Sequence, residues 1–280
     1  MRLIKPSVEI IRQEKYDLLH VFKFIELAGR TCYKSENKIT EDSASEFVNR
    51  MIKSGHGAML EHGTVYLKLY NDESGINRQV ISYKYESNPY SKVNYYNSNI
   101  YITTNYRVII ENNWYKHLKY IIAPTEFHIR RTTVKFICDR GVSHEFVRHR
   151  VFSFAQESTR YCNYTKDKFN NELTFIIPCW IKDLEKGNYY AYCEYHHSKN
   201  DASKRWFDSC MSSEFVYTNL IEEGWKPQEA RTILPNSLKT ELIMTGFNDD
   251  WENFFKLRCA PNAHPQAKEL ADMLKDKFNK

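Results

Sequence analysis

The sequence has little of the two residues that most often interrupt regular structure. Its 280 residues contain only 9 Gly and 8 Pro, whereas 20 Tyr and 16 Phe contribute to an aromatic fraction of 15%. Disordered and fibrous chains show the opposite balance, because they are rich in Gly, Pro or charge and poor in aromatic side chains. The composition therefore excludes both classes and predicts an ordered, aromatic-rich globular protein.

The sequence also lacks a disulfide pattern and a membrane segment. Its 7 cysteines are scattered and odd in number, no two of them form a CxxC pair, and we recognise no secretory signal at its start. We therefore expect reduced thiols in a cytoplasmic protein. No apolar run approaches the roughly 20 residues that cross a bilayer, so we expect no contact with a membrane.

A large excess of charge of one sign is absent as well. The 40 Lys and Arg residues stand against 35 Asp and Glu, which gives a formal net charge of +5. So mild a balance suits small anionic ligands as well as nucleic acid, and it does not decide between them.

Hydrophobic periodicity indicates helices and strands that alternate along one domain, residues 1–280. We expect helices over 43–54, 107–121, 141–150, 201–222, 249–259 and 267–278, a short helix from Pro227, and strands over 64–70, 128–140, 173–180 and 237–246. Residues 79–104 are rich in Tyr, Asn and Ser and predict a polar hairpin or irregular excursion, which we interpret as a surface insertion over about 86–105. Because no Gly-rich strand-turn-helix fingerprint is present, neither a Rossmann nor a P-loop site is predicted.

The most informative stretch is RHRVFSFAQESTR, residues 148–160. The guanidiniums of Arg148 and Arg150 repel each other unless an anion lies between them, and arginine forks match phosphate and carboxylate oxygens. The alternative is a solvated helix end, where cations face the negative pole of the helix dipole. Further polar side chains follow at short range: Ser153, Gln156, Ser158 and Arg160. A nucleoside monophosphate needs such a set, and since no glycine elbow surrounds Ser158, we favour binding over nucleophilic catalysis for that residue.

Histidines near this stretch do not predict a metal site. His144, Glu145 and His149 form the pattern HExxxH. Residues five apart on a helix point roughly 140° away from each other, so the two imidazoles cannot share a metal as they do at i, i+4. We interpret the pair His196-His197 as solvated surface residues.

The spacing RHRxxSxxxxSxR in residues 148–160 resembles the signature of the flavin-dependent thymidylate synthases. The resemblance covers most of the chain. Upstream, Gly55-His56 and Glu61-His62 resemble the family's first block. Downstream, residues 229–235 and the stretch from MTGF through WENFFKLRC resemble its last two blocks.

The resemblance implies an α+β fold with a central mixed or antiparallel β-sheet flanked by helices. It also implies the reductive methylation of dUMP to dTMP, with 5,10-methylenetetrahydrofolate as carbon donor, NADPH as reductant and FAD as hydride carrier. A positive group beside the uracil oxygens stabilises the charge that develops on the ring, and Arg258 matches the position to which the family assigns this activation. Because the family builds each site from several subunits, the resemblance further implies a homotetramer.

Ligand contacts follow from the resemblance residue by residue. For dUMP it implies Glu145, Phe146, Val147, Arg148, Gln156, Glu157, Ser158, Thr159, Arg160, Arg231 and Arg258. For the flavin it implies Ala58, Arg148, His149, Arg150, Gln156, Phe247, Asn248, Asp249 and Asn253. His56 matches a histidine implicated in folate positioning or flavin chemistry. Ala58, Ala155 and Phe247 stand where polar residues are common in the family, so three polar contacts are absent or replaced.

Two other functions are compatible with the same residues. A nucleic-acid-binding module without catalysis would use the basic stretch for phosphates and its interleaved Phe152, Phe154 and Tyr161 for stacking. A flavoprotein of the same fold would act on a different pyrimidine. Bound flavin separates the first alternative from the enzyme, and release of the hydrogen on uracil carbon 5 separates the second.

Overall fold

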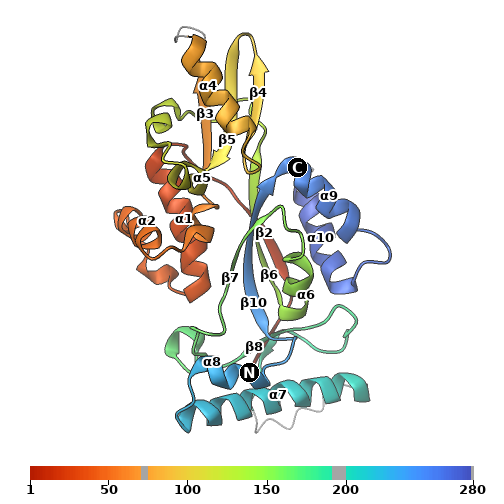
Figure 1. The fold of residues 1–280 in the computed structure, drawn as a ribbon. Helices are drawn as coiled ribbons and strands as arrows, with labels where there is room; N and C mark the ends of the chain where they lie inside the picture. The colour runs from red at the N-terminus through yellow and green to blue at the C-terminus, as the bar shows by residue number, and fades with distance from the viewer. Residues whose placement is uncertain (71–74, 191–199, 279–280) are drawn as a thin grey trace.

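The structure is a computed structural model that describes residues 1–70, 75–190 and 200–278; His196 and His197 lie outside these ranges. Three β-sheets follow one another along an elongated molecule (Figure 1). The central sheet has the order β2 (Ser7–Ile11), β6 (Arg131–Asp139), β10 (Lys239–Phe247) and β7 (Ser153–Gln156), and every neighbouring pair in it is antiparallel. The predicted α+β class with a central sheet is confirmed, and parallel pairing occurs only in a smaller sheet among the described strands.

Helices cover both faces of the central sheet (Figure 1). One face packs its Leu242 and Met244 against α6 (Arg140–Phe146), α9 (Asn248–Arg258) and α10 (Pro265–Phe278). The other face places Ile243 against α1 (Leu18–Tyr33), beside which α2 (Ser43–Lys53) lies. Since successive side chains of a strand point to opposite faces, the continuous burial of β10 from Thr240 to Phe247 reflects cover on both sides.

The second sheet, β3 (Thr64–Leu69), β5 (Asn99–Asn105) and β4 (Lys92–Tyr96), corrects the expectation for residues 79–104. Residues up to Glu86 belong to helix α4 (Gly75–Glu86), and the hairpin begins only at Lys92. Its turn lies at Asn97 and Ser98, whose φ values of 46° and 61° match a tight two-residue hairpin turn. A surface excursion is wrong for β5, because this central strand buries Ile100 and Ile102 in a core of its own.

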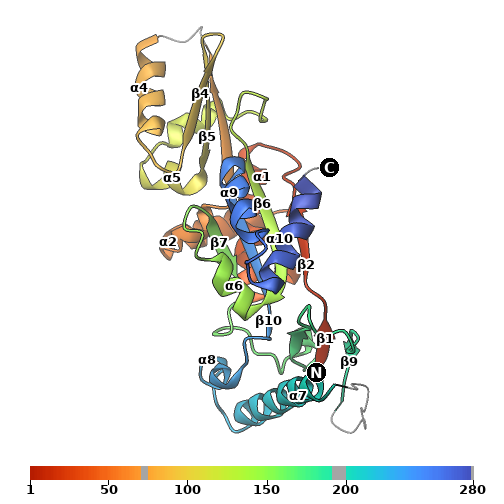
Figure 2. The same ribbon diagram turned by 90° about the vertical axis from the view of Figure 1, so that its right-hand side faces the viewer.

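The third sheet pairs β1 (Arg2–Ile4) in parallel with β8 (Thr174–Ile176) and antiparallel with β9 (Gly187–Asn188). Helix α7 (Asp201–Glu222) lies beneath this sheet (Figure 2), as residues 201–222 predict. Leu3, Phe175 and Tyr217 share its apolar core. No helix of the described residues has the length and hydropathy that a membrane span requires.

The helix predicted over residues 107–121 is divided. Helix α5 (Tyr106–Glu111) ends at Asn112, Asn113 has a φ of 57°, and a 3-10 helix, η2 (Tyr115–Tyr120), follows. A left-handed residue cannot continue a right-handed helix, which explains the break. The remaining short elements are α3 (Gly57–Leu60), α8 (Pro227–Ala230), and the 3-10 helices η1 (Glu36–Lys38), η3 (Asp167–Phe169) and η4 (Arg231–Ile233).

Candidate active site

The RHR signature, residues 148–160, starts just after α6 and ends beside the last turn of α1. Asp139 caps α6 by accepting a hydrogen bond from the backbone N–H of Val142 at 2.7 Å. We predicted a helix over 141–150, but α6 ends at Phe146. After a turn the chain forms edge strand β7, and the backbone N–H of Ser158 then donates to Cys32 O at the end of α1 (2.9 Å).

Arg258, at the end of α9, is held by two groups of the α6 region. Its Nη1 donates to Glu145 Oε2 at 2.8 Å, its Nη2 to Glu145 O at 2.5 Å, and its Nε to His149 Nε2 at 2.9 Å. Burial, and then the charge of Arg258, lower the pKa of His149 to about 4, so its ring is neutral near pH 7 and can accept this hydrogen bond. The structure thus brings Glu145, His149 and Arg258 together.

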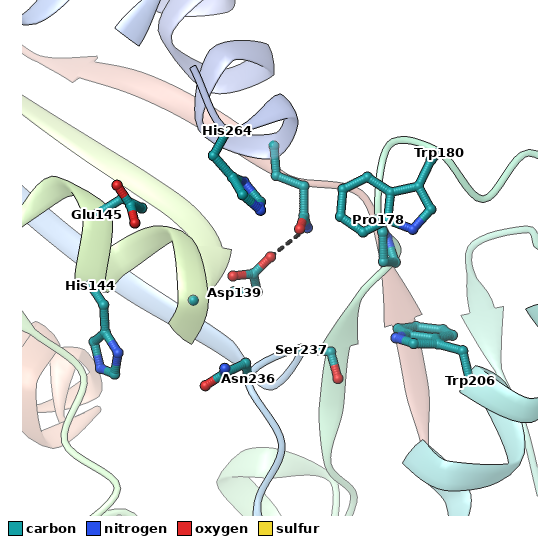
Figure 3. Close-up of a pocket in the computed structure, with 11 residues that line it drawn as sticks. Asp139, His144, Glu145, Pro178, Trp180, Trp206, Asn236, Ser237 and His264 are labelled. Carbon is teal, nitrogen blue, oxygen red and sulfur yellow. Dashed lines mark hydrogen bonds between the residues drawn. The ribbon is translucent and has the colours of Figure 1, made fainter. Parts of the chain in front are cut away.

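A pocket of about 440 Å³ opens beside this cluster (Figure 3). His144 and Glu145 approach it from α6, and Trp180 and Trp206 lie on its opposite side (Figure 3). Burial raises the pKa of Asp139, which also lines the pocket and accepts a hydrogen bond from Gln266. The pocket therefore offers aromatic surface next to a fixed carboxylate and near a guanidinium.

Glu157 has a structural role that the resemblance does not imply. Its side chain is only 1% exposed, and it accepts hydrogen bonds from Tyr164 Oη (3.0 Å) and Lys239 Nζ (2.7 Å). Lys239 also pairs with Glu241 at 2.7 Å, and Glu241 pairs further with Lys34 and Lys135. We call Glu157, Lys239, Glu241, Lys34 and Lys135 the buried charge network; it ties the signature to β10, β6 and the end of α1.

The other end of the signature presents exposed cations. Arg160 is exposed and donates through Nε to Gln228 Oε1 of α8 at 3.3 Å. Arg231, also exposed, follows three residues later in the adjoining η4. Ser158 Oγ accepts from the backbone N–H of Arg160 at 3.3 Å. The structure therefore brings Ser158, Arg160 and Arg231 to one neighbourhood.

The residues implied for the flavin are divided between the two ends of α9. At its first turn Asn248 accepts a hydrogen bond from Thr132 Oγ1 at 2.8 Å, and Asp249 pairs with Lys92 at 2.8 Å. Arg258 ends the same helix ten residues further on, which corresponds to about 15 Å. Asn253 is exposed between them. One chain therefore does not place the turn at 247–249 next to the RHR signature.

Several implied side chains are turned into the protein core. Phe146 is 0%, Thr159 5% and Phe247 7% exposed. Phe247 also has the cations of Lys92 and Arg131 over its ring. Because these side chains and that of Glu157 face the core, any contact of Phe146, Glu157 and Thr159 with dUMP, or of Phe247 with flavin, would use backbone groups.

His56 and Ala58 are exposed on a different side, at the start of α3. His56 lines a groove of about 690 Å³ between α1 and α2, which we call the basic groove. Its other lining residues are Arg30, Tyr33, Lys34, Ser35, Asn37, Lys38, Phe47, Arg50, Met51, Ser54 and Lys168. Sequence reasoning missed this groove and the buried charge network, because their members are far apart in the chain.

The donor set fits an anionic cofactor but offers no metal centre. Arg148 and Arg150 are exposed, and no ion pair within residues 1–70, 75–190 and 200–278 involves either. In the same ranges, no group of three His, Cys, Asp or Glu side chains is arranged to hold a metal ion. Two free guanidiniums beside a neutral imidazole suit phosphate groups of a dinucleotide.

Fold and site together define an α+β protein with a cationic ligand site around a fixed guanidinium. A sequence profile of the family described as thymidylate synthase complementing protein matches residues 112–280, and the chain belongs to this family. The resemblance carried by the signature is thereby confirmed.

Several relatives of this chain are named flavin-dependent thymidylate synthase. It is 30% identical over 173 residues to a flavin-dependent thymidylate synthase of Pyrococcus furiosus (60% of this chain, 64% of the relative). It is 30% identical over 133 residues to one of Geobacter sulfurreducens (47% and 49%) and 21% identical over 264 residues to one of Corynebacterium aurimucosum (88% and 71%). The chain thus matches about half to just under two thirds of the length of the first two relatives. Among solved structures, it is similar to the UMP/dUMP methylase PolB of Streptomyces cacaoi bound with 5-Br UMP, at 14% identity and a TM-score of 0.46 over 99% of this chain and 91% of that one.

Proposed function

We propose that this chain catalyses the reductive methylation of dUMP to dTMP, with 5,10-methylenetetrahydrofolate as carbon donor, NADPH as reductant and FAD as bound cofactor. The proposal rests on membership of the family and on the relatives called flavin-dependent thymidylate synthases. The observation that carries it is the fixed position of Arg258 between Glu145 and His149.

Arg258 has the properties needed to activate uracil. A guanidinium has five N–H groups, and three of those on Arg258 are used by Glu145 and His149. Two N–H groups remain to bond the uracil oxygens, where negative charge develops during attack at the ring. Because the guanidinium is oriented before the ligand binds, its reorganisation costs little during the reaction.

FAD supplies hydride transfer when it is bound. The exposed Arg148 and Arg150 would pair with its phosphates, and His149, which is 9% exposed, would stay neutral beneath the site. Arg160 and Arg231 would hold the phosphate of dUMP. Ser158 would position the nucleotide through its hydrogen bonds to Arg160 and to the end of α1.

A shared site in a homotetramer is part of the proposal. The implied residues form three separate groups in one chain: Glu145 to Arg150 with Arg258, Ser158 to Arg231, and the turn at 247–249. Contributions from different copies would bring such groups to one ligand. Light scattering after size exclusion should give a tetramer, and a stable monomer that turns over dUMP would contradict this part.

The location that we propose is cytoplasmic. All six cysteines in the described ranges are free thiols, which suits a reducing compartment.

The nucleic-acid alternative loses support from the positions of its aromatic rings. Tyr161 is 55% exposed, but Phe152 is only 6% exposed and packs edge-on against Trp251. A stacking platform needs exposed faces, and Phe152 cannot provide one.

Purified protein tests the enzyme directly. It should be yellow, its flavin spectrum should bleach with NADPH, and it should release tritium from dUMP labelled at carbon 5 when folate is present. A colourless protein that fails to bind added FAD would overturn the proposal. Flavin with no tritium release would favour a different pyrimidine substrate.

Arg258→Ala should lower turnover by roughly 10²–10³-fold while flavin stays bound, because one charge-stabilising group is removed. Lys256→Ala is the matched control, since Lys256 is an exposed cation of the same helix. Loss of flavin in the Arg258 variant would show that this residue binds the cofactor instead.

A further inference from the structure

The basic groove between α1 and α2 carries more positive charge than its surroundings neutralise. Five of its lining residues are Lys or Arg, and none is Asp or Glu. Two of the five are paired with nearby carboxylates: Arg30 with the buried Glu26 at 2.9 Å, and Lys34 with Glu36 and Glu241. The other three, Lys38, Arg50 and Lys168, form no ion pair with any described residue.

One of these three has a local explanation. Lys168 Nζ donates to Tyr33 O (3.1 Å) and Lys34 O (3.0 Å), so it caps the end of α1. Lys38 and Arg50 do not cap a helix end in this way. The guanidinium of Arg50 lies 5.3 Å from the centre of the Phe47 ring. The guanidinium of Arg30 lies 5.0 Å from the same centre. These contacts hold both guanidiniums over the buried Phe47 ring, at the side of the groove.

The groove is joined to the signature. The Tyr33 ring lies 5.2 Å from that of Tyr161, the residue after Arg160. His56 lines the same groove and is exposed. A ligand that reacts near the signature could therefore extend into the groove, and the volume of about 690 Å³ is far larger than a single phosphate needs.

We propose that the basic groove binds the oligocarboxylate tail of the folate co-substrate, the chain of γ-linked glutamates that reduced folates carry. This rests on the proposed function. Tyr33, which is half-buried at the groove, suits the methylene groups of such a tail, and Lys38 and Arg50 suit its successive carboxylates. Charge attraction of this kind between exposed groups weakens as salt rises.

Titration calorimetry of the flavin-loaded protein with tetrahydrofolate monoglutamate and triglutamate tests the groove. The triglutamate should bind roughly tenfold more tightly than the monoglutamate at low salt, because two further carboxylates meet two free cations. The double variant Lys38→Gln, Arg50→Gln should bring the ratio of the two Kd values close to one. Lys53→Gln should keep the wild-type ratio, because Lys53 is an exposed cation of α2 that does not line the groove.

Several outcomes would overturn the inference. The two folates could bind the wild type equally, Lys53→Gln could lower the ratio as much as the double variant, or the double variant could change oligomeric state, which would assign these cations to a contact between copies.

Inorganic pyrophosphate should compete poorly with the triglutamate; strong competition would assign the groove to a phosphate ligand instead. If monoglutamate supports dTMP formation but tail length has no effect, only the groove assignment fails. If neither folate supports dTMP formation, the proposed function fails with it.

Discussion

Glu241→Gln tests the buried charge network. Glu241 is 7% exposed at its side chain and pairs with three lysines, at 2.9 Å from Lys34, 2.5 Å from Lys135 and 2.7 Å from Lys239. The amide keeps the shape of the side chain but leaves three ammonium groups converging on a neutral residue. Removing one partner of a buried ion pair costs about 3–5 kcal/mol.

The lower end of that range applies here. Lys34 and Lys135 are 20% and 26% exposed, so water screens part of their repulsion. A loss of about 3 kcal/mol in a chain of this size corresponds to a fall in Tm of roughly 6–12 °C. Thermal unfolding followed by circular dichroism measures it. Glu252→Gln, an exposed residue of α9, is the control and should leave Tm unchanged.

The same variant has a defined dependence on pH. Burial alone raises the pKa of Glu241, but Lys239, Lys34 and Lys135 more than reverse this and hold it below its usual value of 4.5. A carboxyl with a depressed folded pKa stabilises the fold fully above its unfolded pKa and loses that contribution as pH falls below it. The difference in Tm between wild type and Glu241→Gln should therefore shrink below about pH 4.5. A variant within about 1 °C of wild type at pH 7 would refute the reasoning.

Three further outcomes are expected. The folded pKa of His149, about 4, lies below the usual histidine value of 6.5, so stability from this residue is complete above pH 6.5 and falls between pH 6.5 and 4; unfolding free energies of wild type and His149→Gln against pH should show a smaller slope in the variant over that window. Gly246→Ala should destabilise the protein by about 1–3 kcal/mol in a urea titration, because its new Cβ would overlap the ring of Phe152, and a neutral result would mean that the ring moves freely. Ser158→Ala should raise the KM for dUMP and keep measurable turnover, since the hydroxyl positions the nucleotide; complete loss of turnover with dUMP still bound would favour a nucleophilic role.

Local pattern predicted some of the long elements, but not all of them. Residues 201–222 and 43–54 show helical periodicity without interruption, and they form α7 and α2. Helix α1 was not predicted from the sequence, and Gly29 in its second half has a low helix propensity. The structure gives the reason for this glycine: a Cβ there would lie 2.5 Å from the Phe47 ring of α2. Glycine lowers the helix propensity at this position but allows α1 and α2 to pack closely. The sequence pattern alone does not reveal this close packing.

The site was predicted in part. The spacing of RHR with Ser158 and Arg160 predicts an anion site, and the structure adds that Glu145 and His149 hold Arg258 in place. Burial could not be predicted in the same way, because Phe146 and Glu157 lie next to exposed signature residues. Glu241 and Lys34 are 207 positions apart, so no local pattern could join them.

The pairing of β1 with β8 also determines how the chain must be made. Arg2 pairs with Thr174, and Ile4 with Ile176. At roughly 5–20 residues per second of synthesis, the partner strand follows about 10–35 s after the first one leaves the ribosome. During that interval the hydrogen-bonding edge of β1 has no native neighbour, and its Leu3 remains exposed to other nascent chains. The third sheet therefore forms late, after most of the chain has been synthesised.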